Sequence, residues 1–330
     1  MKFTKAVFEA IDIAFNKKQN ESFTIEGAES VVVTKDVLYH TGDVNNCKLD
    51  YYYIPKTTSE KYPVILNIHG GGFVAGDKVY RKSLCTWLAT QGFFVINANY
   101  GLCPECRFPT PILQLTRALN WIHKFSKILK LDLSRVVISG DSAGAYYASM
   151  LCALATNADM QKAFKIKPKI IPTACVLNCG LYDLDHALKS KIILDLNSRV
   201  FEDYTGISEE HILHYKYKEY CSPLSFITKN FPPALLIYAD KDIFCKGQTE
   251  KLIEKLNEND IYFESYNSLS HFANHCFSLT WTSTPAKEAN ALLEKFLNKV
   301  YNGTLPPHQS KATEQIRLEE KVKSKKTLIN

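Results

Sequence analysis

The residues best suited to chemistry lie around Ser142, in the run Gly-Asp-Ser-Ala-Gly at 140–144. A serine between glycines is typical of a sharp turn that leads from a buried strand into a helix and exposes the serine oxygen above the sheet. The glycines remove side chains that would clash in such a turn. An ordinary serine in a glycine-rich turn is the alternative. The apolar run VVIS before the motif and the helical pattern AYYASMLCAL after it favour Ser142 as a nucleophile.

A second motif, His-Gly-Gly-Gly-Phe at 69–73, follows the apolar run PVILNI. Acyl transfer needs donors near the oxygen that becomes negative, and glycines let backbone N–H groups approach that oxygen closely. We predict that Gly71, Gly72 and Ala143 supply these oxyanion-hole donors. The run lacks the Lys-Ser/Thr of a P-loop and the spacing of a dinucleotide fingerprint, which argues against a phosphate cradle.

A serine nucleophile needs a base, and the base needs a carboxylate that orients it, in the chain order Ser, Asp, His. Asp242 follows the apolar run ALLIYA, at the end of a strand where the active face is expected. We choose Asp242, with Asp240 as its rival. His271 and His275 both follow the strand candidate IYFESY and compete for the base. We favour His275.

Short apolar runs alternate with helical patterns along the chain, as expected of a mostly parallel sheet with helices on both faces. The predicted strands are 64–68, 93–98, 136–139, 175–178 and 235–239. The predicted helices are 111–125, 143–155, 249–257 and 286–300. The pattern therefore predicts an α/β fold that positions both glycine motifs at the carboxyl ends of strands.

Two segments, at the N-terminus and after the fourth predicted strand, do not follow this alternation. We predict N-terminal cap helices and leading strands over 1–60, and a cap insertion over 183–220. The catalytic domain then consists of 61–182 and 221–303. The stretch 304–330 is charged and poor in large apolar residues, so we predict a solvated tail there.

Composition excludes several classes of function. Of the formal net charge of +6, the segment 311–330 supplies +3, from six Lys/Arg and three Glu, and the rest of the chain is nearly neutral. This distribution gives no footprint for nucleic acid. Lys5, Glu9 and Asp12 interrupt the apolar core that a secretory signal needs, and no apolar run is long enough to span a bilayer. We expect a cytoplasmic protein without membrane insertion.

Ten cysteines without regular spacing fit reduced thiols better than a disulfide framework. Cys103 and Cys106 form a lone C-x-x-C, and no second pair with zinc-ligand spacing accompanies it. We therefore expect no metal. We also expect no organic cofactor, because serine chemistry needs none.

Together these motifs resemble the hormone-sensitive-lipase-like family of α/β-hydrolases, a group of esterases named for its His-Gly-Gly-Gly motif. The resemblance extends over about 61–299 and includes HGGGF, GDSAG, the segments SPL at 222–224 and FPP at 231–233, and ADKDIF at 239–244. It implies an α/β-hydrolase fold with a helical cap, and it supports Asp242 over Asp240. We add Phe73, Tyr100 and Asp141, which lie in or near the motifs, as substrate-binding candidates.

The resemblance leaves the histidine open. The family places its base in His-x-Phe, which fits His275 followed by Cys276 and Phe277. It also tends to place a tyrosine five residues before the base, and Tyr266 stands five residues before His271.

The resemblance implies a serine carboxylesterase that hydrolyses small, short-chain acyl esters of the acetyl type through an acyl-enzyme. Its partner would be a small-molecule ester, and a homodimer is one hypothesis for its assembly. Two alternatives are a peptidase of the same fold and a ligand-binding protein built on an inactive hydrolase scaffold. Such binding proteins typically lose the histidine, whereas two candidates remain here.

Overall fold

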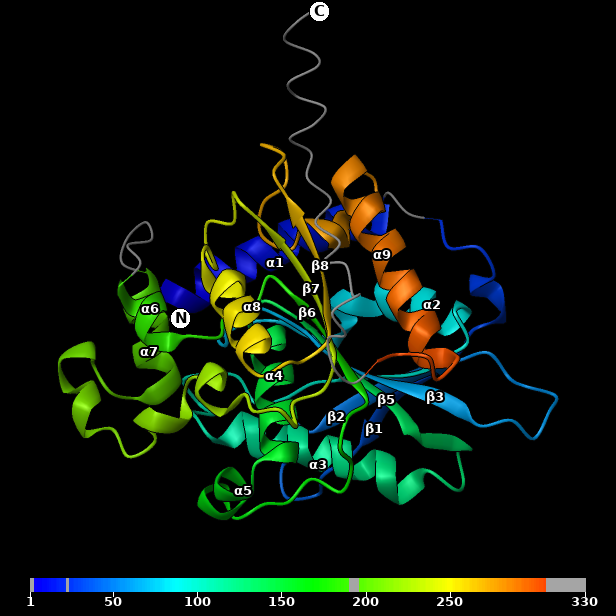
Figure 1. Ribbon diagram of the computed structural model, residues 1–330, viewed down its shortest axis with the longest axis horizontal. Coiled ribbons are helices and arrows are strands. Elements are labelled where there is room, and N and C mark those ends of the chain that lie inside the picture. Colours follow the sequence, from blue (N-terminus) through cyan, green and yellow to red (C-terminus); the bar gives the residue numbers. More distant parts are fainter. Residues whose placement is uncertain (1–2, 22–23, 190–195, 307–330) are drawn as a thin grey trace, which may run out of the picture.

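A computed structural model describes residues 3–21, 24–189 and 196–306. Its centre is an eight-stranded sheet in the order β1-β2-β4-β3-β5-β6-β7-β8 (Figure 1). The strands are β1 Val32–Leu38, β2 Lys48–Tyr53, β3 Tyr62–Ile68, β4 Phe94–Ala98, β5 Leu131–Asp141, β6 Ala174–Asn178, β7 Ala234–Ala239 and β8 Phe263–Ser268. The pairs β1–β2 and β2–β4 are antiparallel, and all other neighbours are parallel. The prediction of a mostly parallel sheet is confirmed.

The central strands are apolar on both faces because each face supports its own core. Successive strand residues point to opposite faces. On β3, Val64, Leu66 and Ile68 therefore belong to one core, and Ile65 belongs to the other. This explains why the strand reads as a continuous apolar run rather than as an alternation of apolar and polar residues.

Helices cover both faces of the sheet. Leu115, Leu151 and Leu252 place α3 (Thr110–Phe125), α4 (Ala143–Thr156) and α8 (Gln248–Glu258) against the first core. The second core is covered by α2 (Lys82–Thr90) and α9 (Thr284–Tyr301). Figure 1 shows α9 on the opposite side of the strands from α3 and α4. Sequence analysis missed α2, because nine residues give too short a periodic pattern.

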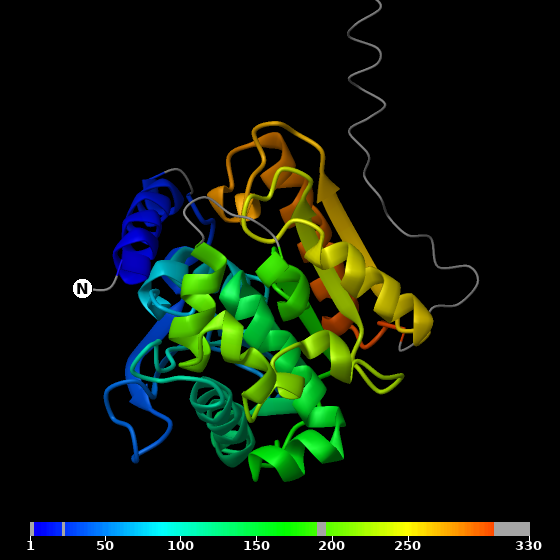
Figure 2. The same ribbon diagram turned by 90° about the vertical axis from the view of Figure 1, so that its left-hand side faces the viewer.

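The segments that break the alternation are helical. The N-terminal α1 (Phe3–Glu21) is followed by a short turn, Ala28–Ser30. After β6 come α6 (Leu184–Lys189) and α7 (Leu196–Thr205), then short 3₁₀ helices at Glu209–His214, Lys218–Tyr220 and Pro223–Phe226. A further short helix, α5 (Ala158–Phe164), precedes β6. Figures 1 and 2 show α1 beside α7. Thr4 Oγ1 in α1 donates a hydrogen bond to Asp203 Oδ2 in α7 at 2.5 Å, and both residues are buried.

Within the described ranges, no helix has the length and apolar character needed to cross a membrane. All ten cysteines lie in these ranges and are free thiols. Most of the charged tail predicted over 304–330 lies outside the described residues, which end at 306.

The Thr4–Asp203 hydrogen bond should hold α1 in place. We expect Thr4→Val, which keeps the shape and removes the donor, to lower the free energy of unfolding of α1 by about 1–3 kcal/mol. Hydrogen exchange of the α1 amides should accelerate accordingly. Thr58→Val, in an exposed loop, is the matched control and should change nothing. Unchanged exchange in Thr4→Val would mean that α1 is held by packing alone.

Candidate active site

Ser142 occupies the turn between β5, which ends at Asp141, and α4, which begins at Ala143. Its backbone has φ 52° and ψ −120°. A non-glycine residue reaches this region only when its surroundings impose it. The Ser142 N–H donates to the carbonyl of Asn178 at the end of β6, at 2.8 Å. This bond to the neighbouring strand helps to hold the strained turn.

Glycines flank the turn because backbone passes very close on both sides. A Cβ on Gly144 would lie 2.1 Å from the Ile68 carbonyl oxygen, and one on Gly140 would lie 2.3 Å from the Gly144 carbonyl. Neither position has room for a side chain. The steric reason inferred from the sequence therefore holds at both positions.

The hydroxyl of Ser142 is linked to a histidine and an aspartate. Ser142 Oγ lies 2.7 Å from His275 Nε2, and His275 Nδ1 lies 2.9 Å from each carboxylate oxygen of Asp242. The two rivals lie elsewhere. His271 is exposed, and Asp240, also exposed, accepts a hydrogen bond from Asn267 at 2.9 Å. Of the four candidates, the structure brings only His275 and Asp242 to Ser142.

Asp242 is a buried carboxylate with several donors. Its Oδ1 accepts the backbone N–H groups of Phe244 and Cys245 at 2.8 and 2.9 Å. Burial raises its pKa, but the attraction of His275 and these hydrogen bonds together outweigh burial and hold the pKa below its usual value. The carboxylate therefore stays ionised beside the imidazole.

The glycine loop after β3 needs unusual backbone angles. Gly71 has φ 128° and Gly72 has φ 59°. A Cβ on Gly71 would lie 2.1 Å from the Ala75 carbonyl oxygen, and the Gly71 carbonyl accepts the Ala75 N–H at 2.9 Å. Gly72 and Ala143 both line a cavity beside Ser142, so the loop and the start of α4 face the same space.

His69 and Tyr100 support the glycine loop through hydrogen bonds to its backbone. Their rings stack at 4.5 Å, and the Tyr100 hydroxyl donates to the His69 carbonyl at 2.8 Å. Burial lowers the pKa of His69 to about 4, so its neutral ring donates from Nδ1 to the Gly70 carbonyl at 2.8 Å. Tyr100 does not line either cavity beside Ser142. Tyr100, predicted as a substrate contact, thus lies against His69 rather than in the wall of these cavities.

Asp141 binds an arginine that sequence analysis did not identify. Arg81 directs Nε and Nη2 to the two carboxylate oxygens of Asp141, each at 2.6 Å, and both side chains are buried. Sixty positions separate the partners, so no local pattern connects them. Asp141 still lines the larger cavity, but both its oxygens already accept hydrogen bonds from Arg81.

In the part of the chain that the structure describes, Ser142 lines a smaller and a larger cavity. The smaller, about 70 Å³, has a mostly apolar wall that is lined by Phe8, Gly72, Phe73, Ala143, Leu181, Leu184, Ala187, Leu188, Leu196, Asn197, Val200, Phe201, Tyr204, Phe244 and Cys245. The larger, about 290 Å³, is lined by Phe8, Ile11, Asp12, Gly71, Gly72, Arg81, Asp141, Ile243, Phe244, Asn274, His275 and Cys276. Phe73, a predicted substrate contact, thus belongs to the smaller cavity.

Asp12 in α1 is a second residue that sequence analysis missed. Its side chain is only 9% exposed, and its Oδ2 has no hydrogen-bond partner. Burial raises its pKa to about 7, and Arg81 opposes this effect only in part. In the sequence Asp12 is only one charge on a helix, and nothing local shows that α1 folds over Ser142.

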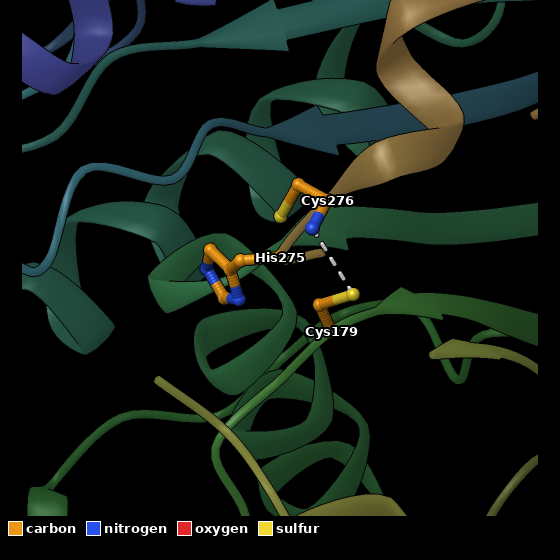
Figure 3. Close-up of side chains that lie close together, drawn as sticks. All are labelled: Cys179, His275 and Cys276. Atoms are coloured by element: carbon orange, nitrogen blue, oxygen red, sulfur yellow. Dashed lines mark hydrogen bonds between the residues drawn. The ribbon is translucent and has the colours of Figure 1, made fainter. Parts of the chain in front are cut away.

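A cysteine pair lies directly beside the histidine. The ligand atoms of Cys179, His275 and Cys276 all lie within 4.8 Å of one another. Figure 3 shows the imidazole to one side of the two cysteines, with the Cys276 N–H directed at the Cys179 sulfur, at 3.2 Å. Metal binding needs thiolates, and burial raises the pKa of both thiols. Both ring nitrogens of His275 also already have hydrogen-bond partners, so a metal would have to compete with Ser142 and Asp242.

Sequence comparison connects the chain to known hydrolases. Residues 49–256 match the model of the BD-FAE family. The esterase LipQ of Mycobacterium tuberculosis is 24% identical over 277 residues, which cover 81% of this chain and 62% of LipQ. This chain therefore spans less than two thirds of that relative's length. A putative α/β hydrolase of Acanthamoeba polyphaga mimivirus is 22% identical over 322 residues, or 93% of this chain and 86% of the viral protein.

Solved structures share the fold. Esterase B from Lactobacillus rhamnosis superposes with a TM-score of 0.79 at 20% identity, covering 91% of this chain and 96% of that one. A hyperthermophilic esterase from Pyrobaculum calidifontis gives 0.66 at 21% identity, covering 92% and 93%. The predicted α/β-hydrolase fold is confirmed, and both LipQ and esterase B are named as esterases, in agreement with the predicted enzyme class. With more than half of its length matched by the family model, this chain belongs to the BD-FAE family of α/β-hydrolase esterases.

Proposed function

We propose that this protein is a serine carboxylesterase that hydrolyses small esters through an acyl-enzyme. The observation that carries the proposal is the unbroken chain from Ser142 Oγ to His275 Nε2 at 2.7 Å, and from His275 Nδ1 to Asp242 at 2.9 Å. A nucleophile, a base and an orienting carboxylate within hydrogen-bond reach are the requirements for nucleophilic acyl transfer.

In this proposal His275 takes the Ser142 proton as Oγ attacks the ester carbonyl. Asp242 holds the imidazole in the tautomer that accepts the proton at Nε2, and its carboxylate stabilises the imidazolium that forms. His275 then gives the proton to the leaving alcohol. In the second half, His275 takes a proton from water as the water attacks the acyl-enzyme. His275 then returns this proton to Ser142 Oγ as the acid leaves.

The oxyanion of the tetrahedral intermediate would accept hydrogen bonds from the backbone of Gly71, Gly72 and Ala143. Support comes from the cavities, since Gly72 lines both of them and Ala143 lies next to the nucleophile. Each such donor is worth on the order of 2.7–4 kcal/mol of the barrier.

We also propose that the chain is of the His-Gly-Gly-Gly type, related to the hormone-sensitive-lipase-like esterases, with 61–182 and 221–303 as its catalytic domain. In this division α1 and the insertion 183–220 form a cap. The contacts of Phe8 support it. A Cβ on Gly72 would lie 2.5 Å from the Phe8 ring, and that ring lies 5.9 Å from Phe244.

The smaller cavity supports a preference for short acyl groups. Residues of α6 and α7, among them Leu188 and Val200, line its wall. At about 70 Å³ it is the smaller of the two cavities, which favours a short acyl group over a long one. Esterase B, which shares the fold, has been crystallised inhibited by a tributyrin phosphonate.

Of the alternatives, an inactive ligand-binding scaffold is the one that activity measurements exclude most directly. With wild-type protein we expect hydrolysis of p-nitrophenyl acetate and butyrate and labelling by a fluorophosphonate probe. Ser142→Ala should lose both, because the hydroxyl that forms the acyl-enzyme is removed. A wild-type protein that neither turns over nor labels would contradict the esterase and favour the binding protein.

The histidine assignment predicts a clear difference between two neighbouring variants. His275→Ala should lower kcat/KM by several orders of magnitude, since the base and general acid are removed together. The matched control His271→Ala replaces an exposed histidine of the same loop and should retain wild-type rates. Steady-state kinetics on p-nitrophenyl butyrate measure both, and the opposite pattern would make His271 the base.

The acyl-length preference should depend on the wall of the smaller cavity. We expect kcat/KM for p-nitrophenyl octanoate to be well below that for the butyrate. Val200→Ala should raise the octanoate-to-butyrate ratio about tenfold, because one or two missing methyl groups change apolar discrimination by that order. Val44→Ala, at a position 52% exposed, is the control. An unchanged ratio would place the acyl chain outside this cavity.

A further inference from the structure

An unpaired carboxyl group faces the space where the substrate must lie. Asp12 lines the larger cavity together with Ser142 and His275. It is 9% exposed, and its Oδ2 has no hydrogen-bond partner. Leaving a buried polar atom without a partner costs folding free energy, so such an atom calls for a reason other than stability.

Arg81 attracts Asp12 through its charge, but its hydrogen bonds go to other residues. Arg81 directs Nε and Nη2 to Asp141 and Nη1 to the Tyr80 carbonyl at 3.3 Å. These bonds use three of the five guanidinium N–H groups, and none of the three goes to Asp12. Asp12 Oδ2 itself has almost no exposed surface, but the residue lines the cavity, so a ligand that enters the cavity can contact its carboxyl group.

The chemistry of the proposed reaction assigns the two cavities to the two halves of the ester. His275 must give a proton to the leaving alcohol, so the alcohol lies on the side of the histidine. His275 lines only the larger cavity, whereas the smaller cavity is lined by Ala143 and apolar residues of α6 and α7. The alcohol half therefore lies beside Asp12. This step rests on the proposed function.

We propose that Asp12 is a specificity-determining residue that binds a free hydroxyl group on the alcohol half of the substrate. A carboxylate accepts a hydrogen bond from such a hydroxyl, and a protonated carboxyl donates one, so Asp12 can bind it in either state. Phe8, Ile11 and Ile243 line the same cavity and would contact the carbon skeleton. The preferred substrates are esters in which a short alcohol keeps one hydroxyl close to the ester bond.

The test compares two esters of equal size. 2-Hydroxyethyl butyrate and propyl butyrate differ only in replacing a terminal methyl by a hydroxyl. Wild-type protein should prefer the hydroxyethyl ester by about tenfold in kcat/KM, which corresponds to one hydrogen bond to a carboxyl group. Asp12→Leu should abolish or reverse this preference, and Asp12→Asn, which still donates and accepts, should retain part of it.

The ratio of the two rates separates substrate binding from a merely structural role, because misfolding lowers both rates together. Glu9→Gln is the matched control, an acidic residue of the same helix that does not line the cavity, and it should keep the wild-type ratio. Fluorophosphonate titration counts active sites in every variant. If Asp12→Leu does not fold, Asp12→Ala makes the same comparison.

Either of two results would overturn the proposal: no preference in the wild-type protein, or a preference that survives in Asp12→Leu. Both results are distinct from failure of the proposed function. If the proposed function failed, hydrolysis of propyl butyrate would not depend on Ser142 at all. An esterase that depends on Ser142 but is indifferent to Asp12 would sink only the further inference.

Discussion

The strained turn at Ser142 is the constraint on which the rest of the site depends. A residue with φ 52° and ψ −120° costs on the order of 1–3 kcal/mol and persists only if its surroundings leave no alternative. Here β3, β5 and helix α4 lie so close together that a Cβ on Gly140 or Gly144 would overlap backbone atoms, and the Ser142 N–H is bonded to Asn178 at the end of β6. The turn is thus held by the core of the sheet, and the hydroxyl is directed out of that core toward the two cavities.

Buried carboxyl groups surround this turn, and their environments differ. Asp242 accepts two backbone N–H groups and faces His275, which keeps it ionised. Asp141 is paired with Arg81 through both oxygens. Asp12 has an oxygen without a partner and a pKa of about 7. Three aspartates therefore have three roles. Asp242 orients the base, Asp141 holds the site together, and Asp12 is proposed to bind substrate. The neighbouring groups of each carboxyl determine its role.

The N-terminal helix gives the site much of its selectivity in this account. Phe8 contributes to both cavities, and Asp12 lies one turn further along the same face of α1. The Thr4–Asp203 hydrogen bond connects this helix to α7, whose residues line the smaller cavity. A change in the position of α1 would therefore alter both halves of the binding site together.

Much of the fold can be read from local patterns. Buried parallel strands need continuous apolar runs, and a sharp strand-to-helix turn needs glycines, so the central strands and both glycine motifs are visible in the sequence. Helix α2 and the two antiparallel strands at one end of the sheet, β1 and β2, are less visible. They are short or partly exposed, and they lack a strong periodic signal.

The sequence by itself determined the fold class, the enzyme class and the small set of residues from which a nucleophile, a base and an acid could come. Two histidines and two aspartates are candidates by local pattern, with His275 and Asp242 favoured, and the tertiary structure brings these two to Ser142. It also decided that Arg81 pairs with Asp141 and that Asp12 faces the cavity. Such contacts join positions far apart in the chain, and their energies depend on burial and distance, which no local pattern of residues specifies.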